Sequence, residues 1–456
     1  MSAPKSLWAE HALMPNGWAS NVRIDIDQSG IINSVLANQQ AAGERTGLLL
    51  PAMANLHSHA FQRAMAGMTE TRGSDPEDSF WSWRKLMYRF LNHLGPEECE
   101  AIAAFGQLEM LEAGYTSVGE FHYLHHQPNG DPYTNRAEMS ERMIAAAVQS
   151  GIGLTLLPVL YEQGGCDGRE LVGGQKRFGN TMDQYAALFS QASAGVANTE
   201  NANIGIAPHS LRAASQQSLT QSHQLADGKP FHIHIAEQQA EVDELIASYK
   251  ARPVQWLLEN HDVDQTWCLI HATQMTPTET TQLAASGAVA GLCPITESNL
   301  GDGIFDGKRY LDNAGKWGIG TDSNVRISLS EELRTLEYSQ RLRDMRRAVY
   351  AEPDRSNGRI LFDAALAGGA QALQRRSGCI AAGYKADLLS LDINSTSFLG
   401  VGNDGWLDAW LFAHDDSLVT NVWANGQLVV TDGKHIRREQ IESQYRATMK
   451  KLTAYL

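Results

Sequence analysis

The sequence is poor in cysteine, in basic residues and in long apolar runs, and each shortage excludes a class of protein. Its 456 residues include five scattered cysteines and no C-x-x-C pair, so neither a disulfide framework nor a thiolate zinc knuckle is indicated. Acidic residues (52) outnumber lysine and arginine (37), giving a formal charge of −15, which argues against nucleic-acid or anionic-membrane partners. No apolar run reaches the ~20 residues of a membrane span, and the N-terminus has no apolar signal segment. We therefore expect a soluble protein of the reducing cytoplasm.

The middle of the chain alternates strand-like apolar runs with helical stretches, a pattern typical of βα units around a parallel sheet. A closed (β/α)8 barrel needs eight such strands. The sequence offers eight runs, at residues 48–57, 116–122, 152–161, 203–210, 230–237, 267–273, 288–294 and 317–324. Long segments at 69–83 and 162–180 follow the first and third runs, where loops of a barrel cover the mouth of the active site.

Both ends of the chain carry short alternating strands instead. Residues 22–36 alternate around Ser29-Gly30, and residues 421–436 alternate around two further turn dipeptides, Asn-Gly and Asp-Gly. Such patterns are typical of β-hairpins. We expect the two ends to pair into one sheet-based domain.

The motif His57-Ser58-His59 closes the first strand-like run. Residues i and i+2 of a strand point to the same side, so both imidazoles can converge on one metal ion. The strand ends of a parallel barrel share one face, where its chemistry lies. Five later runs also end in histidine or acid, namely His122, His209, His234 with Glu237, His271 and Asp322. Polar residues at six strand ends are hard to explain by packing alone.

Three histidines and one aspartate are a suitable shell for Zn²⁺ with room for a water, whose pKa zinc lowers to about 7. We assign the ligands to His57, His59, His234 and Asp322. Glu237, three residues after His234, is the candidate for taking the water proton and passing it to a leaving nitrogen. His271, on the next strand, is the candidate for hydrogen bonding to the nucleophile or stabilising developing charge. Without a metal site, Glu237 would be a solvent-facing acid at a helix start.

The stretches LHSHAFQR, HIHIAEQ, LIHATQM and GIGTDSN, in this order, resemble the motifs of the amidohydrolase superfamily, specifically its aminohydrolase branch. KADLLSLD and VWANGQLVVTDGK resemble the β-sandwich that members build from both chain ends. The resemblance implies a (β/α)8 barrel over residues 51–375. It implies that residues 1–50 and 376–456 form the β-sandwich, the latter adding a closing helix.

The same resemblance implies the roles of the site residues. Metal ligands fall on His57, His59, His234 and Asp322, with Glu237 and His271 as proton-transfer partners and Asp322 also counted as catalytic. Members with two metals carry a bridging lysine or acid on the central strands. Here the fourth strand ends in Pro208-His209-Ser210, which implies a single divalent metal.

Within this branch, DSFWSWRKLMYRF, GEFHYLHH, APHSLRA and TDSNVRISLSEELR resemble the formimidoylglutamate deiminases. The implied reaction, a step of histidine degradation, hydrolyses an amidine to a formamide and ammonia. The implied substrate has two carboxylates, which arginine forks bind bidentately. The candidate substrate-binding residues are Gln62, Arg84, Tyr123, His209 and Arg212. Arg326 is a weaker candidate, better interpreted as structural.

Two other functions remain open. A guanine or cytosine deaminase would share every metal residue, and Phe80, Trp81 and Trp83 could stack on a base. An aromatic cluster in a loop is more often the core of the loop itself, and the arginines favour a dicarboxylate. A non-catalytic binding homologue is disfavoured because every ligand and Glu237 are present. The resemblance also implies a homodimer.

Overall fold

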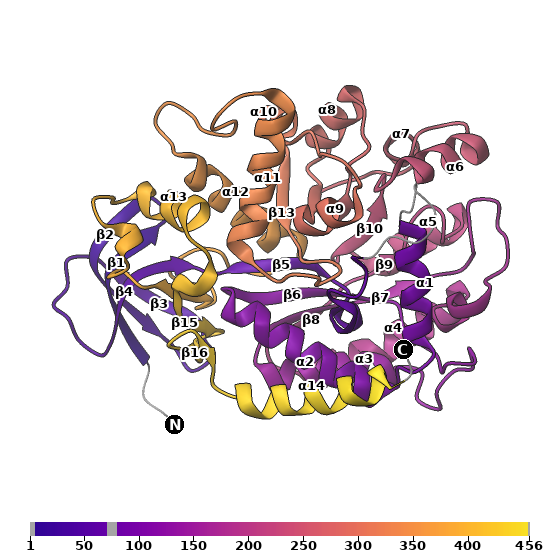
Figure 1. Ribbon diagram of the computed structural model, residues 1–456, viewed down its shortest axis with the longest axis horizontal. Coiled ribbons are helices and arrows are strands. Elements are labelled where there is room, and N and C mark those ends of the chain that lie inside the picture. The colour runs from indigo at the N-terminus through magenta and orange to yellow at the C-terminus, as the bar shows by residue number, and fades with distance from the viewer. Residues whose placement is uncertain (1–4, 71–79, 455–456) are drawn as a thin grey trace.

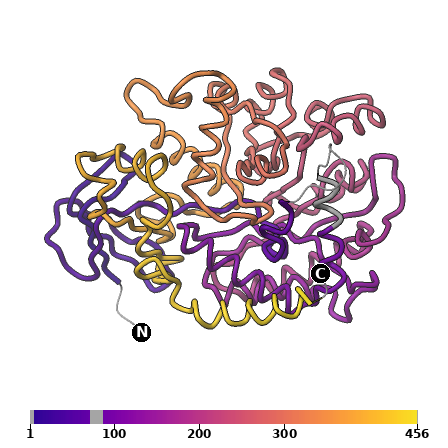
Figure 2. The backbone as a smooth tube through the Cα atoms, viewed as in Figure 1, coloured from indigo at the N-terminus to yellow at the C-terminus, as the bar shows by residue number. Residues whose placement is uncertain are grey.

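The computed structural model describes residues 5–70 and 80–454, without the side chains of residues 80–85 (Figures 1 and 2). The predicted strand-like runs all form strands, which lie in two parallel sheets ordered β5-β6-β7-β8, with β9 on β7, and β10-β11-β12-β13. Their bounds are β5 (Met53–Ser58), β6 (Tyr115–His122), β7 (Gly153–Leu160), β8 (Ala202–Ile204), β9 (Ala207–Pro208), β10 (Phe231–Ile235), β11 (Trp267–His271), β12 (Val289–Leu292) and β13 (Lys316–Ile319).

Isolated parallel bridges join the two parallel sheets at both of their edges. Ser58, at the end of β5, pairs with Asp322 beyond β13. On the other side, Ile206 pairs with Phe231 and Ser210 pairs with His234. These pairings bring the carboxyl ends of β5, β10 and β13 to a common edge.

Two of the predicted strands are divided in the structure. The run 48–57 was predicted as one strand, but it belongs to two sheets: its first half lies in β4 (Glu44–Pro51) and its second half in β5. The fourth run is split into β8 and β9 around Gly205, where a Cβ would lie 2.5 Å from Pro230 O. Only glycine therefore allows this close approach to the chain before β10.

Helices alternate with the parallel strands and cover them, as Figure 1 shows. The helix α2 (Pro96–Glu112) has a proline in its first turn, and α12 (Asn357–Ala372) packs on β13 and β5. In the described part of the chain the others are α1 (Phe80–Leu91), α3 (Glu138–Ser150), α4 (Met182–Ala197), α5 (Gln216–Ala226), α6 (Gln239–Tyr249), α7 (Pro253–Asn260), α8 (Pro277–Ser286), α9 (Pro294–Leu300), α10 (Gly307–Asp312), α11 (Leu329–Asp344), α13 (Asp404–Ala413) and α14 (Arg438–Thr453), with 3-10 turns η1 (Ala60–Met65), η2 (Gly173–Arg177), η3 (Thr396–Phe398) and η4 (Asp416–Leu418).

Both chain ends contribute to one eight-stranded mixed sheet, which Figure 1 shows at one end of the molecule. Its order is β17-β16-β15-β14-β4-β1-β2-β3, and all three predicted hairpins are present as antiparallel pairs. The strands are β1 (Lys5–Met14), β2 (Gly17–Ile26), β3 (Ile32–Leu36), β14 (Leu388–Leu391), β15 (Val419–Ala424), β16 (Gln427–Thr431) and β17 (Lys434–His435). The turn at Gly30 lies against Asn425, in the turn between β15 and β16, although three strands of the sheet separate these two hairpins. The sheet is therefore curled.

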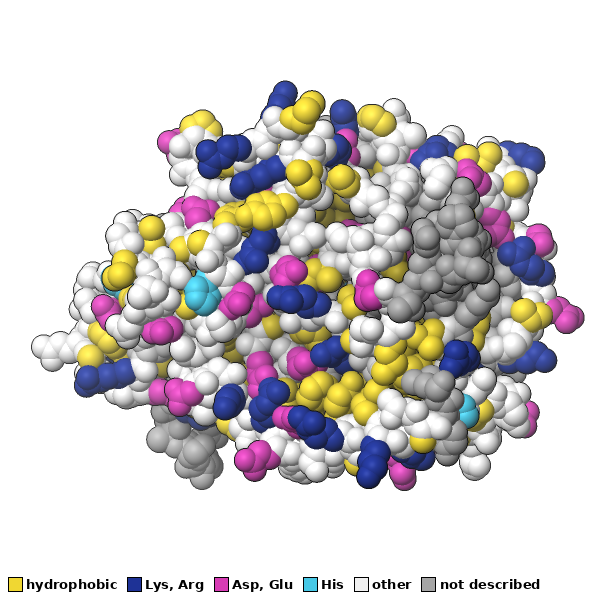
Figure 3. Space-filling view, viewed as in Figure 1, with side chains coloured by type: hydrophobic (Ala, Val, Ile, Leu, Met, Phe, Trp, Pro, Cys, Tyr) yellow, Lys and Arg dark blue, Asp and Glu magenta, His cyan; other side chains and the backbone are white. Residues whose placement is uncertain are grey.

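The C-terminal helix and the surface complete the architecture. The helix α14 leaves the mixed sheet and packs on α2, where the rings of Phe105 and Tyr445 stack at a centroid distance of 4.1 Å. Figure 3 shows charged side chains of both signs spread over the face in view. Among the described residues, no helix combines the length and apolarity needed to cross a membrane.

Candidate active site

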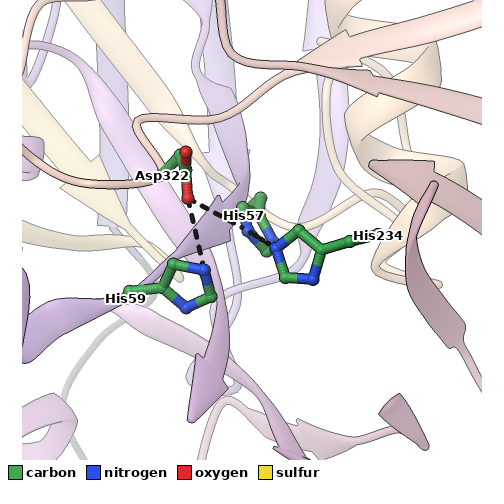
Figure 4. A group of neighbouring side chains, drawn as sticks. All are labelled: His57, His59, His234 and Asp322. Carbon is green, nitrogen blue, oxygen red and sulfur yellow. Dashed lines mark hydrogen bonds and ion pairs between the residues drawn. The ribbon is translucent and has the colours of Figure 1, made fainter. Parts of the chain in front are cut away.

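Four side chains meet at the carboxyl ends of β5, β10 and β13 (Figure 4). They are His57, His59, His234 and Asp322, and their ligand atoms lie within 4.8 Å of one another. Asp322 Oδ1 is 3.3 Å from Nε2 of both His57 and His59, and the Nε2 atoms of His57 and His234 are 3.1 Å apart. His57 lies in β5 and His59 directly follows its last residue, and their ring centroids are 4.6 Å apart, so the two imidazoles converge as the spacing predicted.

The hydrogen bonds and charges of this group fit a divalent cation. Nδ1 of His59 lies 2.8 Å from Phe121 O and Nδ1 of His234 lies 3.0 Å from His209 O. Each Nδ1–H therefore donates to a carbonyl and leaves the Nε2 lone pair facing the other ligands. Burial lowers the pKa of His57 to about 3 and also lowers the pKa of His59 and His234. Neutral imidazoles are the form that binds metal.

Asp322 supplies the negative charge of the group. Burial alone would raise its pKa, but the neighbouring rings of His57 and His59 lower it. At neutral pH the group therefore holds one carboxylate and three imidazole lone pairs directed at one point. Such a donor set suits a borderline divalent metal ion such as Zn²⁺.

A buried polar network holds the strand ends in place. Asn55 Nδ2 donates to Thr321 Oγ1 at 2.7 Å, and Asn324 Nδ2 donates to His59 O at 3.2 Å. Asp322 and Asn324 have φ of 44° and 54°, values that non-glycine residues adopt at a cost of about 1–3 kcal/mol where the surroundings enforce them. The network thus fixes the turn that presents Asp322.

Glu237 and His271 border the same group. His271 Nε2 lies 3.9 Å from Glu237 Oε1 and 4.0 Å from Asp322 Oδ2. Burial lowers the pKa of His271, but Glu237 and the other nearby carboxylates raise it to about 10. Burial raises the pKa of Glu237 above its usual range, while His271 and Arg212 oppose this rise. The two groups therefore form a buried pair of opposite charge type beside the four clustered side chains.

A pocket opens from these residues and contains most of the predicted substrate-binding side chains. It is lined by His59, His234, Glu237, His271 and Asp322 together with Gln62, Tyr123, His209 and Arg212. Gln62 Nε2 donates to Tyr123 Oη at 2.7 Å. Arg212 forms no hydrogen bond through Nε with any described residue, although this atom is buried. A guanidinium in that state is suited to an anionic ligand.

Several lining residues were not predicted from the sequence. They are Met87, Tyr88, Tyr161, Phe178, Leu300 and Ser323. Phe178 follows η2 and belongs to the expected segment 162–180, which therefore contributes to the pocket wall. Met87 and Tyr88 come from α1, a few residues beyond the other expected segment, 69–83. The position of a long segment after a strand predicted that it would line the pocket, but nothing in the sequence identified the individual lining residues.

Other candidates lie elsewhere or outside the described residues. Arg84 and the aromatic residues Phe80, Trp81 and Trp83 belong to α1, but their side chains are outside the described part of the structure. His122 sits at a strand end as expected, yet its Nε2 bonds Ser140 Oγ at 2.8 Å and it does not line the pocket. Arg326 is exposed and pairs with Glu331 at 2.5 Å, in line with its structural interpretation.

Comparisons with known proteins cover nearly the whole chain. A family model described as the amidohydrolase family matches residues 48–429, and one described as the N-terminal domain of formimidoylglutamate deiminase HutF matches residues 5–47. The formimidoylglutamate deiminase of Pseudomonas aeruginosa is 49% identical over 95% of this chain and 96% of its own. A crystal structure of an amidohydrolase from Brucella melitensis is 44% identical, covering 98% of this chain and 100% of that one, with a TM-score of 0.94. An adenosine deaminase from Xanthomonas campestris with bound zinc shares the fold at 19% identity, covering 99% and 100%, with a TM-score of 0.82.

Proposed function

The chain belongs to the amidohydrolase family, and from this premise we propose that it hydrolyses N-formimidoyl-L-glutamate to N-formyl-L-glutamate and ammonia, a step of histidine degradation. The observation that carries the proposal is the likeness, over nearly its whole length, to a curated formimidoylglutamate deiminase. Its support in the structure is a pocket that joins a metal-binding group to a buried guanidinium.

The metal ion is proposed to be Zn²⁺, held by His57, His59, His234 and Asp322. When bound, such an ion activates a water near neutral pH. Glu237 borders the pocket beside His271, so we assign it to accept the proton from that water and to deliver it to the leaving nitrogen. We assign His271 Nε2 to hydrogen bond with the reacting centre as charge develops there.

The rest of the pocket is assigned to the glutamate part of the substrate. Arg212 would bind one carboxylate through its guanidinium fork. Gln62, Tyr123 and His209, which line the same pocket, would hydrogen bond with the other polar groups. Arg84 completes the proposed set as a second cation, contributed by α1.

We also propose that the two parallel sheets form one closed (β/α)8 barrel over residues 51–375. The bridges at both of their edges support this closure. The curled mixed sheet would be the β-sandwich built from residues 1–50 and 376–456. Its separate buried cluster, which includes Leu7, Val22 and Trp423, supports a core of its own.

A homodimer in the reducing cytoplasm, without nucleic-acid or membrane partners, is part of the same proposal. Two apolar side chains at the end of α11, Leu342 and Met345, are 81% and 91% exposed, which is compatible with a subunit contact. All five cysteines are free. Light scattering of the purified protein measures the subunit number directly.

The test is ammonia release by metal-loaded protein from N-formimidoyl-L-glutamate, guanine, cytosine and adenosine, assayed side by side. We expect turnover of the amidine alone, with equal amounts of N-formyl-L-glutamate and ammonia. Turnover of a nucleobase or nucleoside instead would contradict the substrate assignment, and the four aromatic side chains of the pocket, Tyr88, Tyr123, Tyr161 and Phe178, would then be the stacking surface. Binding of metal with no turnover of any compound would favour a non-catalytic homologue.

A further inference from the structure

Glu297 contacts His271 from behind the pocket. It lies in the first turn of α9, and its Oε1 is 3.2 Å from His271 Nδ1. Both side chains are buried, with 6% of Glu297 and 1% of His271 exposed. Glu297 does not line the pocket, so any effect on the reaction would have to pass through His271.

This contact determines which ring nitrogen of His271 faces the substrate. A carboxylate beside Nδ1 favours the form in which Nδ1–H donates to it. Nε2 is then the atom on the side of Glu237 and Asp322, at 3.9 and 4.0 Å. The same logic orients a histidine in serine hydrolases, where a buried carboxylate on one nitrogen fixes the tautomer of the other.

Glu297 is itself held firmly. Its Oε1 accepts the backbone N–H of Cys293 at 2.9 Å, and its carbonyl accepts the N–H of Asp302 at 2.9 Å. Asp302 Oδ1 in turn accepts from Gln238 Nε2 at 2.9 Å, and Asp302 O accepts from Gln274 Nε2. The segment 293–302 is therefore bonded to the residues that follow both Glu237 and His271 in the chain.

We propose that Glu297 is a positioning residue of the deiminase, which holds the His271 ring with Nε2 toward the substrate. The inference rests on the proposed function, because that function gives His271 its role in the reaction. A carbonyl acceptor at the same place is sufficient for this task, since it also accepts from Nδ1–H. The expected loss on removing Glu297 is in kcat, because neither the metal ligands nor the pocket lining changes.

The test compares Glu297→Ala, Glu297→Gln and a matched control, Glu332→Ala. Glu332 is also fully buried and also accepts a backbone N–H of α9, from Ile295 at 2.9 Å. We expect E297A to lower kcat by ~10²-fold, a typical share for a proton-transfer group, with KM and metal content close to wild type. E297Q should recover most of this loss. E332A should lower thermal stability but leave kcat within about threefold of wild type.

A readout without substrate keeps the inference separate from the proposed reaction. With ¹⁵N-labelled histidine, the ring signals of His271, identified by their loss in His271→Asn, should show a hydrogen-bonded Nδ1–H in wild type and E297Q and the loss of this hydrogen bond in E297A. An equal kcat loss in E332A, a loss of metal in E297A, or an unchanged Nδ1–H signal of His271 in E297A would overturn the proposal. If wild type acts on another compound, only the substrate assignment fails. The same variants, assayed with that compound, then test whether Glu297 positions His271.

Discussion

Two buried polar clusters lie at opposite ends of the parallel strands, and they differ in how their charges are matched. The cluster at the carboxyl ends consists of acceptors, the three histidine Nε2 atoms and Asp322. The cluster at the amino ends contains Arg375, Lys385 and Asp387. Lys385 Nζ donates to Asn201 Oδ1 at 3.0 Å and to Asn425 Oδ1 at 2.9 Å, and Arg375 also donates to Asn201.

This difference in charge matching indicates that the cluster at the carboxyl ends binds a ligand and that the cluster at the amino ends has a structural role. At the amino ends, cations and their acceptors lie in the same cluster, and Arg375 and Lys385 oppose the rise in the pKa of Asp387 that burial causes. At the carboxyl ends, lone pairs face each other beside an open pocket, an arrangement that costs free energy until a cation joins it. A bound metal should therefore stabilise the folded protein.

The largest expected effect comes from removing a metal ligand. His59→Ala should reduce the metal content to near zero and ammonia release to background, because an imidazole donor is lost from the shell. Adding Zn²⁺ to metal-free wild type should raise its Tm but should not raise that of H59A. His122→Ala is the matched control, because His122 is also a buried histidine at a strand end but bonds Ser140. Equal metal loss in both variants would contradict the assignment of the ligands.

Glu237→Gln should have the next largest effect, because it keeps the metal group and removes the proton carrier. We expect kcat to fall by ~10²–10⁴-fold with full metal content. Glu162→Gln is the control: this acid follows β7, accepts from Ser215 N at 3.1 Å and does not line the pocket. Near-normal turnover of E237Q, measured by ammonia release, would rule out the proton-transfer role.

The sequence was sufficient to predict the residues at the strand ends but not the direction in which each one points. In β6 all eight residues are buried, so no polar alternation shows which side faces the site. The structure places the ring of Phe121 against His57, at a centroid distance of 5.1 Å, and turns the neighbouring His122 away. Fully buried strands hide their orientation because both faces are apolar.

Contacts between elements that are distant in the sequence could not be predicted either. Glu297 has no motif of its own, and its position near His271 depends on how α9 leaves β12. The pairing of Asn55 with Thr321 depends on the bridges between β5 and the chain beyond β13. By contrast, the H-x-H spacing needed only the two-residue period of a strand, which explains why the convergence of His57 and His59 could be predicted.

Arg212→Met should have a smaller and more selective effect. Losing a hydrogen bond to a charged group costs about 1.5–3 kcal/mol, so kcat/KM should fall ~10–150-fold, mainly through KM, with metal content unchanged. An analogue that lacks one carboxylate should show a smaller difference between wild type and R212M. Arg326→Met is the control, because Arg326 is exposed and pairs with Glu331. An unaltered kcat/KM would remove Arg212 from the carboxylate site.

The smallest effect on turnover is expected at the opposite cluster. Arg375→Met removes the hydrogen bonds that the guanidinium donates to Asn201 and to Leu154 O, and it takes a cationic neighbour from Asp387, which is buried with 1% exposed. The free energy of unfolding should therefore fall by about 1–3 kcal/mol. At low temperature, kcat and metal content should stay within about twofold of wild type, because the cluster touches neither the metal group nor the pocket. Adding Asp387→Asn should restore part of the stability, since it removes the uncompensated charge. Urea midpoints and ammonia release of the three proteins test this independence, and a kcat loss comparable to that of E237Q would show that the two ends of the parallel strands act together.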